Sequence, residues 1–175
     1  MTVKRTGAAD KRLFAALFME AWTMADMDER MMELALAQAR LAAQEGEIPV
    51  GAVLVRRGEV LAQAHNRREG SHDPTAHAEI LCMREAARVL GDWRLRDCVL
   101  YVTLEPCPMC AGAMVMSQLG ECVYGAADPR QGCCGSVYDL PGDPALSAVT
   151  RWRPAPKSKE CGEILKEFMR GRRLF

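Results

Sequence analysis

Two short motifs constrain this chain more than any other feature: His77-Ala78-Glu79 and Pro106-Cys107-Pro108-Met109-Cys110. A catalytic zinc ion takes three protein ligands and leaves its fourth tetrahedral position to water, and one histidine with two thiolates supplies that number. Zinc lowers the pKa of its bound water from near 16 to roughly 7, provided that a nearby base takes the proton. Glu79 is the candidate for that base. The motifs therefore predict one zinc site with the ligands His77, Cys107 and Cys110.

Both motifs fall where the sequence predicts the beginning of a helix. Thr75 is a candidate N-cap for the first helix, and Pro108 suits the first position of the second, which follows a buried strand over Val99 to Thr103. Residues two apart on a regular helix point to nearly opposite sides, so His77 and Glu79 share a site only near a helix end. The positive end of a helix dipole also favours thiolate, the form of cysteine that binds zinc.

Each motif alone has a plainer interpretation. A single C-x-x-C motif also occurs in redox proteins of the thioredoxin type, and a histidine two residues before a glutamate is commonly an ordinary surface pair. A purely structural zinc site needs a fourth protein ligand. Cys133 and Cys134, adjacent in a glycine-flanked loop, are either additional soft ligands, exposed thiols or loop residues near the site.

Periodicity predicts an α/β fold with a mixed sheet and helices packed on its faces. A helix through Met31 and Leu41 ends at Gly46, and a hairpin of two strands follows around Arg57-Gly58. The later elements are expected in alternation, at Thr75 to Leu90, Cys98 to Thr103, Pro108 to Leu119, Glu121 to Tyr124 and Ser158 to Arg173. Residues 1–26 are expected to be a poorly ordered extension, and residues 27–175 one domain that carries the predicted zinc site.

Composition narrows the class of protein further. A chain of 175 residues, 49% hydrophobic and 26% charged, is long enough to bury one core. The formal net charge of zero argues against a broad field for nucleic acid, so any RNA contact has to come from local patches. The sequence contains no stretch long enough to span a membrane. None of its eight cysteines is expected to form a disulfide, which favours a reducing cytoplasm.

At these residues the chain resembles the zinc-dependent nucleoside and nucleobase deaminases, which carry an H-x-E and P-C-x-x-C signature. The resemblance is closer still to the bacterial tRNA-specific adenosine deaminases, and it runs from about residue 27 to the C-terminus. The segments that carry it are 49–53, 66–68, 72–80, 100–107, 109–114 and 160–173.

The resemblance implies a cytidine-deaminase-like three-layer α/β/α fold with a sheet of about five strands. It implies hydrolytic deamination of adenosine to inosine at the wobble position of a tRNA anticodon, by zinc-activated water with Glu79 as proton shuttle. A homodimer is expected as the working form, with a tRNA anticodon stem-loop as partner. The substrate contacts that it implies are Asn66, Ala78, Pro106 and Asp128, and the RNA contacts are Arg170, Arg172 and Arg173.

The residues alone leave plainer roles open for several of these positions. Asn66 is equally typical of a turn at a strand end, Asp128 before Pro129 commonly starts a turn, and arginines at a helix C-terminus are favoured by its dipole. Glu105 is expected to orient a loop rather than to take part in catalysis. The nearest rival function is deamination of a free base or nucleoside, such as guanine or cytosine, at the same metal centre.

Overall fold

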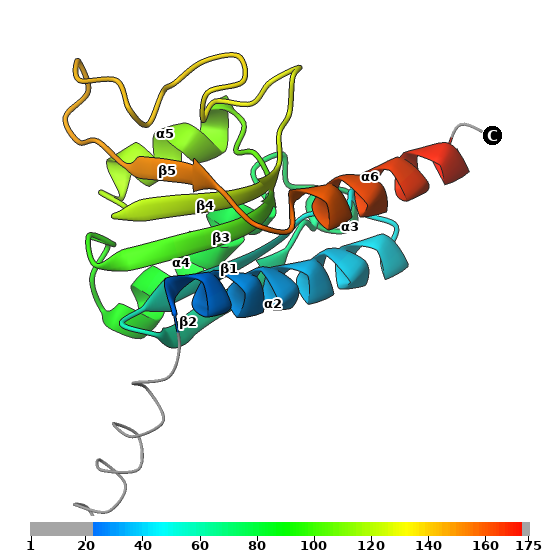
Figure 1. Ribbon diagram of the computed structural model, residues 1–175, viewed down its shortest axis with the longest axis horizontal. Helices are drawn as coiled ribbons and strands as arrows, with labels where there is room; N and C mark the ends of the chain where they lie inside the picture. Colours follow the sequence, from blue (N-terminus) through cyan, green and yellow to red (C-terminus); the bar gives the residue numbers. More distant parts are fainter. Residues whose placement is uncertain (1–22, 173–175) are drawn as a thin grey trace, which may run out of the picture.

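The computed structural model describes residues 23–172, which build a five-stranded mixed sheet in the order β2-β1-β3-β4-β5 (Figure 1). Strand β1 (Gly51–Arg56) pairs antiparallel with β2 (Glu59–His65) and with β3 (Cys98–Leu104). Strands β3, β4 (Glu121–Ala126) and β5 (Arg151–Pro154) run parallel. Arg57 and Gly58, both with positive φ, form the two-residue turn of the predicted β1–β2 hairpin.

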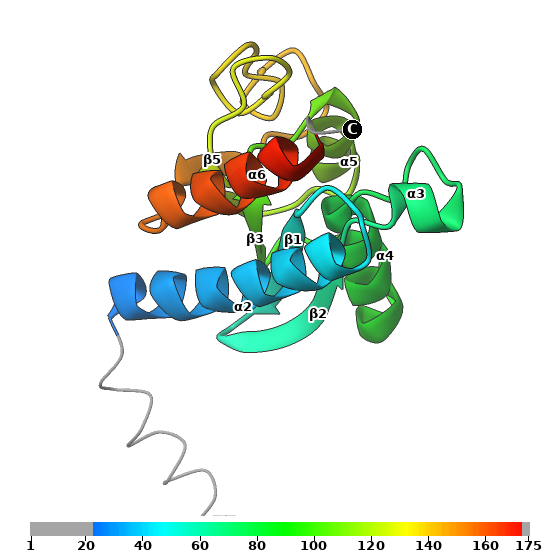
Figure 2. The same cartoon turned by 90° about the vertical axis from the view of Figure 1, so that its right-hand side faces the viewer.

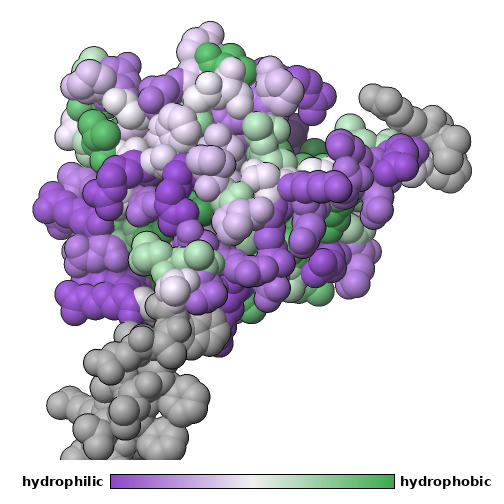
Figure 3. All heavy atoms as spheres, in the orientation of Figure 1, coloured by the Kyte–Doolittle hydropathy of each residue, from purple (hydrophilic) through white to green (hydrophobic). Residues whose placement is uncertain are grey.

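Helices cover both faces of this sheet, so the predicted three-layer α/β/α class is confirmed (Figures 1 and 2). On one face, α2 (Met24–Gln44) and α6 (Ser158–Arg172) pack against alternate strand residues, among them Val53, Tyr101 and Val123. On the other face, α4 (Ala78–Leu90) and α5 (Pro108–Met116) pack against the intervening ones, among them Leu54, Leu100 and Cys122. Figure 3 shows hydrophilic side chains over much of the outer surface where α2 and α6 lie, as expected of amphipathic helices.

Several elements differ from the predicted ones, and helix α5, for example, ends at Met116 rather than Leu119. Helix α4 begins at Ala78 rather than Thr75, because the backbone N–H and hydroxyl of Thr75 both donate to the Asp73 carboxylate in a preceding turn. Helix α3 (Arg68–Ser71) and strand β5 were not predicted, since both are four residues long and too short to show a period.

The predicted boundary after residue 26 lies inside α2. Thr23 and Asp26 form a capping box that begins this helix at Met24. The rest of the predicted extension lies outside the described residues. Within residues 23–172, no helix combines the length and the apolar composition needed to cross a membrane.

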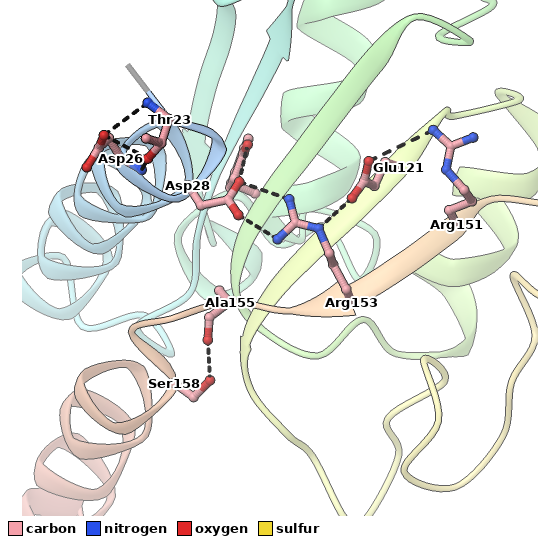
Figure 4. A network of polar contacts seen from close by, with 9 residues as sticks. Thr23, Asp26, Asp28, Glu121, Arg151, Arg153, Ala155 and Ser158 are labelled. Atoms are coloured by element: carbon pink, nitrogen blue, oxygen red, sulfur yellow. Dashed lines mark hydrogen bonds and ion pairs between the residues drawn. The ribbon is translucent and has the colours of Figure 1, made fainter. Parts of the chain in front are cut away.

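A buried ion-pair network fixes α2 against the far edge of the sheet (Figure 4). The Asp28 carboxylate on α2 accepts two hydrogen bonds from the Arg153 guanidinium on β5, at 2.5 and 2.9 Å, and one from the Tyr101 hydroxyl at 2.8 Å. Arg153 also donates to Glu121 on β4 at 2.7 Å. This one arginine therefore joins β5, the shortest strand, to two neighbouring elements.

We predict that Arg153→Met destabilises the protein, because it leaves the Asp28 carboxylate buried without a countercharge. Loss of one partner of a buried pair costs about 3–5 kcal/mol, and the partial exposure of Arg153 reduces this to about 2–3 kcal/mol in urea unfolding. Adding Asp28→Asn to Arg153→Met removes the stranded charge and should restore part of the lost stability. A single variant within about 0.5 kcal/mol of the original protein would contradict this account.

Candidate metal centre and active site

Two helix N-termini bring the three predicted zinc ligands together. His77 is the N-cap of α4, Cys107 is the N-cap of α5, and Cys110 lies in the first turn of α5. Pro108 occupies the first helical turn as predicted, where its missing N–H costs no hydrogen bond. The ligand atoms of the three residues all lie within 4.8 Å of one another, so the sequence prediction that they meet is confirmed.

The spacing of these atoms fits a tetrahedral zinc ion. His77 Nδ1 lies 3.6 Å from Cys107 Sγ and 3.6 Å from Cys110 Sγ. Bonds of about 2.3 Å to sulfur and about 2.0–2.1 Å to nitrogen, meeting at about 109°, separate nitrogen and sulfur by about 3.6 Å. The donor set is one imidazole and two thiols, and Cys133 and Cys134 are not part of the cluster found among residues 23–172. A fourth coordination position therefore remains for water, as a catalytic zinc site requires.

The electrostatics of the cluster favour a thiolate. Hydrogen bonds from Cys110 and His77 lower the pKa of the Cys107 thiol to about 4. The pKa of the Cys110 thiol is raised because it shares its proton with Cys107 and is buried. The pKa of His77 is raised by its hydrogen bond to Cys107. A divalent cation bound here would displace the shared proton, because its charge stabilises both thiolates at once.

Glu79 is buried, with 4% of its surface exposed, and lines the same pocket as His77 and Cys107. Burial raises the pKa of its carboxyl group. His77 has an extended backbone, at φ −74° and ψ 150°, because it precedes the helix rather than belonging to it. This is why two residues that a regular helix would point apart both line one pocket.

Asn66 follows β2 and also lines the pocket, with 5% of its surface exposed. Its Nδ2 donates to Glu47 Oε2 at 2.9 Å, and the backbone N–H of Gly70 donates to Glu47 Oε1 at 2.7 Å. Sequence reasoning missed Glu47, which is 1% exposed. The only signal was a glutamate beside the apolar start of a strand, and such a residue is usually solvent-exposed.

Glu105 holds the loop after β4, as expected from the sequence. Its buried carboxylate accepts hydrogen bonds from the backbone N–H groups of Asp128, Cys134 and Ser136, and from the Ser136 hydroxyl. Gly132 packs so closely that an added Cβ would overlap this carboxyl group, so only glycine fits there.

The other predicted substrate contacts are Ala78, Pro106 and Asp128. Ala78 is fully buried at the start of α4, and the Pro106 carbonyl accepts a hydrogen bond from the N–H of Cys133. The Asp128 carboxylate accepts from the N–H of Arg130 in a local turn, and Asp128 is not among the pocket-lining residues. Within residues 23–172 the Asp128 carboxylate makes the local contact that the turn interpretation predicts, while its backbone N–H donates to Glu105.

The predicted RNA-binding arginines lie at the end of α6. Arg172 donates to the carbonyl of Gly46, next to Glu47, and stacks over the Phe168 ring at 4.7 Å. Arg170 is exposed and donates to the carbonyl of Lys166 at 3.4 Å. Arg173 lies outside the described residues.

Comparisons with known proteins agree with this geometry. Residues 25–126 match the cytidine and deoxycytidylate deaminase zinc-binding region. The chain is 46% identical over 143 residues to the tRNA-specific adenosine deaminase of Bacillus subtilis, covering 82% of this chain and 89% of the relative.

Two solved structures are also similar. One, from a study of A-to-I editing by tRNA:A34 deaminases at the wobble position of transfer RNA, has a TM-score of 0.75 and 42% identity, over 78% of this chain and 99% of that chain. The other, guanine deaminase from Bacillus subtilis, has a TM-score of 0.56 and 30% identity, over 84% of this chain and 94% of that chain. The fold and the His-Cys-Cys cluster define a zinc-dependent deaminase, and the chain belongs to the family of the tRNA-specific adenosine deaminases.

We predict one tightly bound zinc ion per chain, lost when a ligand is removed. Cys107→Ser should weaken zinc binding by more than about 100-fold, since changes to residues merely behind the ligands already cost 10–100-fold. Cys133→Ser is the matched control and should keep its zinc. Elemental analysis after dialysis against a chelator measures both. Loss of zinc from the control would show a fourth protein ligand and contradict an open catalytic site.

Proposed function

We propose that this enzyme hydrolytically deaminates adenosine to inosine at the wobble position of a tRNA anticodon. The observation that carries the proposal is the meeting of a three-ligand zinc cluster with a buried glutamate in one pocket. The identity to a tRNA-specific adenosine deaminase over most of both chains supports the choice of substrate. The unpaired bases of an anticodon loop can leave the stack and enter such a pocket at little cost.

The site residues divide the chemistry among them. His77, Cys107 and Cys110 would hold a zinc ion, which when bound would supply an activated water at neutral pH. In this proposal, Glu79 accepts a proton from the attacking water and delivers it to the departing amino group, so that water and adenosine become inosine and ammonia. Its burial keeps the side chain out of bulk solvent, in the pocket that His77 and Cys107 also line. Asn66, Ala78, Pro106 and Asp128 are proposed to contact the nucleotide.

The polynucleotide lies, in this proposal, across the end of α6, where Arg170, Arg172 and Arg173 contact its phosphates. Arg172 reaches the Gly46 carbonyl, beside the segment that carries Glu47, and this supports a location near the pocket. A second candidate function is deamination of a free base, which the likeness to guanine deaminase favours. A small substrate needs no contact with the end of α6.

We further propose that residues 27–175 belong to one deaminase domain, which works as a homodimer in the cytoplasm. Large apolar side chains are exposed at the end of α5, on Met116, and on the connection from β4 to β5, on Val137, Tyr138 and Val149. All eight cysteines are free thiols, as a reducing compartment predicts.

Sedimentation velocity should give twice the mass of the chain, and a monomer at micromolar concentration would contradict the dimer.

We predict that Glu79→Gln keeps the fold and the zinc but loses activity, because the amide has the same shape and cannot shuttle a proton. General acid/base groups contribute about 10²–10⁴-fold, so kcat on an anticodon stem-loop should fall by at least about 100-fold. Zinc content and thermal stability serve as controls. Activity within about tenfold of the original enzyme would exclude Glu79 as the proton shuttle.

We predict that replacing Arg170, Arg172 and Arg173 together with alanine weakens RNA binding. It should also reduce the slope of log K against log salt by about 1 for each phosphate that is no longer neutralised. Arg56, Arg94 and Arg96 provide a matched triple control, because they lie by the end of β3 at Cys98, away from Cys107 at its other end. Equal effects of the two triple variants would contradict a specific RNA site on α6.

A further inference from the structure

Glu47 is a buried carboxylate that does not line the pocket but contacts two segments that do. It is 1% exposed and follows Gly46 in the turn after α2, where its own N–H donates to the Ala42 carbonyl at 2.9 Å. Ile48 and Val50, next along the chain, line the pocket, as do Asn66 and Arg68. A buried carboxylate requires hydrogen-bond donors, and here they are Asn66 and Gly70.

The chemistry of these hydrogen bonds fixes the orientation of the Asn66 side chain. An ionised carboxylate only accepts, and Glu47 Oε1 already accepts from the N–H of Gly70 at 2.7 Å. The group that Asn66 turns toward Glu47 Oε2, at 2.9 Å, therefore has to be its NH₂ group. The amide oxygen Oδ1 is then left over, and no residue within 23–172 donates a hydrogen bond to it.

We propose that Glu47 is a positioning residue that orients Asn66 so that the pocket presents the amide oxygen, a hydrogen-bond acceptor, to a donor group of the bound nucleotide. This inference rests on the proposed function, because Glu47 would act on the bound nucleotide through Asn66. Glu47 also accepts a hydrogen bond from the backbone N–H of Gly70, which holds α3 in place. Arg68 of this helix lines the pocket. One carboxylate thus sets the positions of Asn66 and of α3, two parts of the pocket lining.

Glu47→Gln tests the orientation, because it changes one acceptor into a donor and keeps the shape. The backbone N–H of Gly70 cannot reverse, so the oxygen of the new amide must remain toward it and the new NH₂ group must face Asn66. Asn66 then turns its oxygen to that NH₂ group and presents its own NH₂ to the pocket. A donor facing a donor should raise KM for an anticodon stem-loop by about 10–100-fold, while kcat stays within about threefold.

The exchange variant Glu47→Gln with Asn66→Asp supplies the rescue. Its carboxylate at position 66 accepts from the amide at position 47 and still presents an oxygen to the pocket, with the net charge unchanged. We expect KM to return to within about fivefold of the original value, whereas Asn66→Asp alone places two carboxylates together and should not recover. Glu45→Gln, the same change on an exposed neighbour, is the matched control and should leave KM unchanged.

The measurements are kcat and KM on the stem-loop, with zinc content and thermal midpoint for every variant. A purely structural role for Glu47 would lower the amount of folded, zinc-loaded enzyme without moving KM, and that result overturns the proposal. If Glu47→Gln does not fold, the exchange variant decides: folded, zinc-loaded protein with a KM still raised more than about tenfold contradicts it. An original enzyme without activity on the stem-loop overturns the proposed function itself, which is a distinct outcome.

Discussion

The convergence of two helix N-termini at one end of β3 is the constraint on which the site depends. Helix α5 begins shortly after β3 ends, and α4 packs beside it on the same face of the sheet, so His77 and Cys107 are both N-cap residues. An N-cap residue has extended backbone geometry and directs its side chain past the helix end. Neither residue uses its side chain to cap its own helix, which leaves the imidazole and the thiol free to meet at 3.6 Å.

Around this cluster of metal ligands, two buried carboxylates hold the neighbouring loop segments in place. Glu105 binds the N–H groups of the loop after β4, and Glu47 binds Asn66 and the backbone of α3. Both carboxylates accept hydrogen bonds from groups distant in the sequence. Each therefore restrains a loop beside the pocket. Glu79 lines the same pocket, and burial raises the pKa of its carboxyl group. A raised pKa suits a group that has to exchange a proton.

Much of the fold could be predicted because the relevant signals are local. The apolar runs in β1 and β3, the turn at Arg57-Gly58 and the proline that begins α5 each act over a few residues. The zinc cluster was predictable because ligand type and helix starts are both visible in the sequence. Glu47 was not, since its role depends on Asn66 and Gly70, which are brought to it by the hairpin and the following turn. The start of α4 was misplaced because Asp73 competed with the helix for Thr75.

The most direct test of the whole account is the identity of the substrate. Purified protein is incubated with unmodified total tRNA, and in parallel with free guanine, cytosine and adenosine, while inosine is scored by sequencing and ammonia is measured. We expect inosine at the first anticodon position of tRNAs that carry adenosine there, and no ammonia from the free compounds. Rapid release of ammonia from a free base, with tRNA unchanged, would contradict it while leaving the metal chemistry intact.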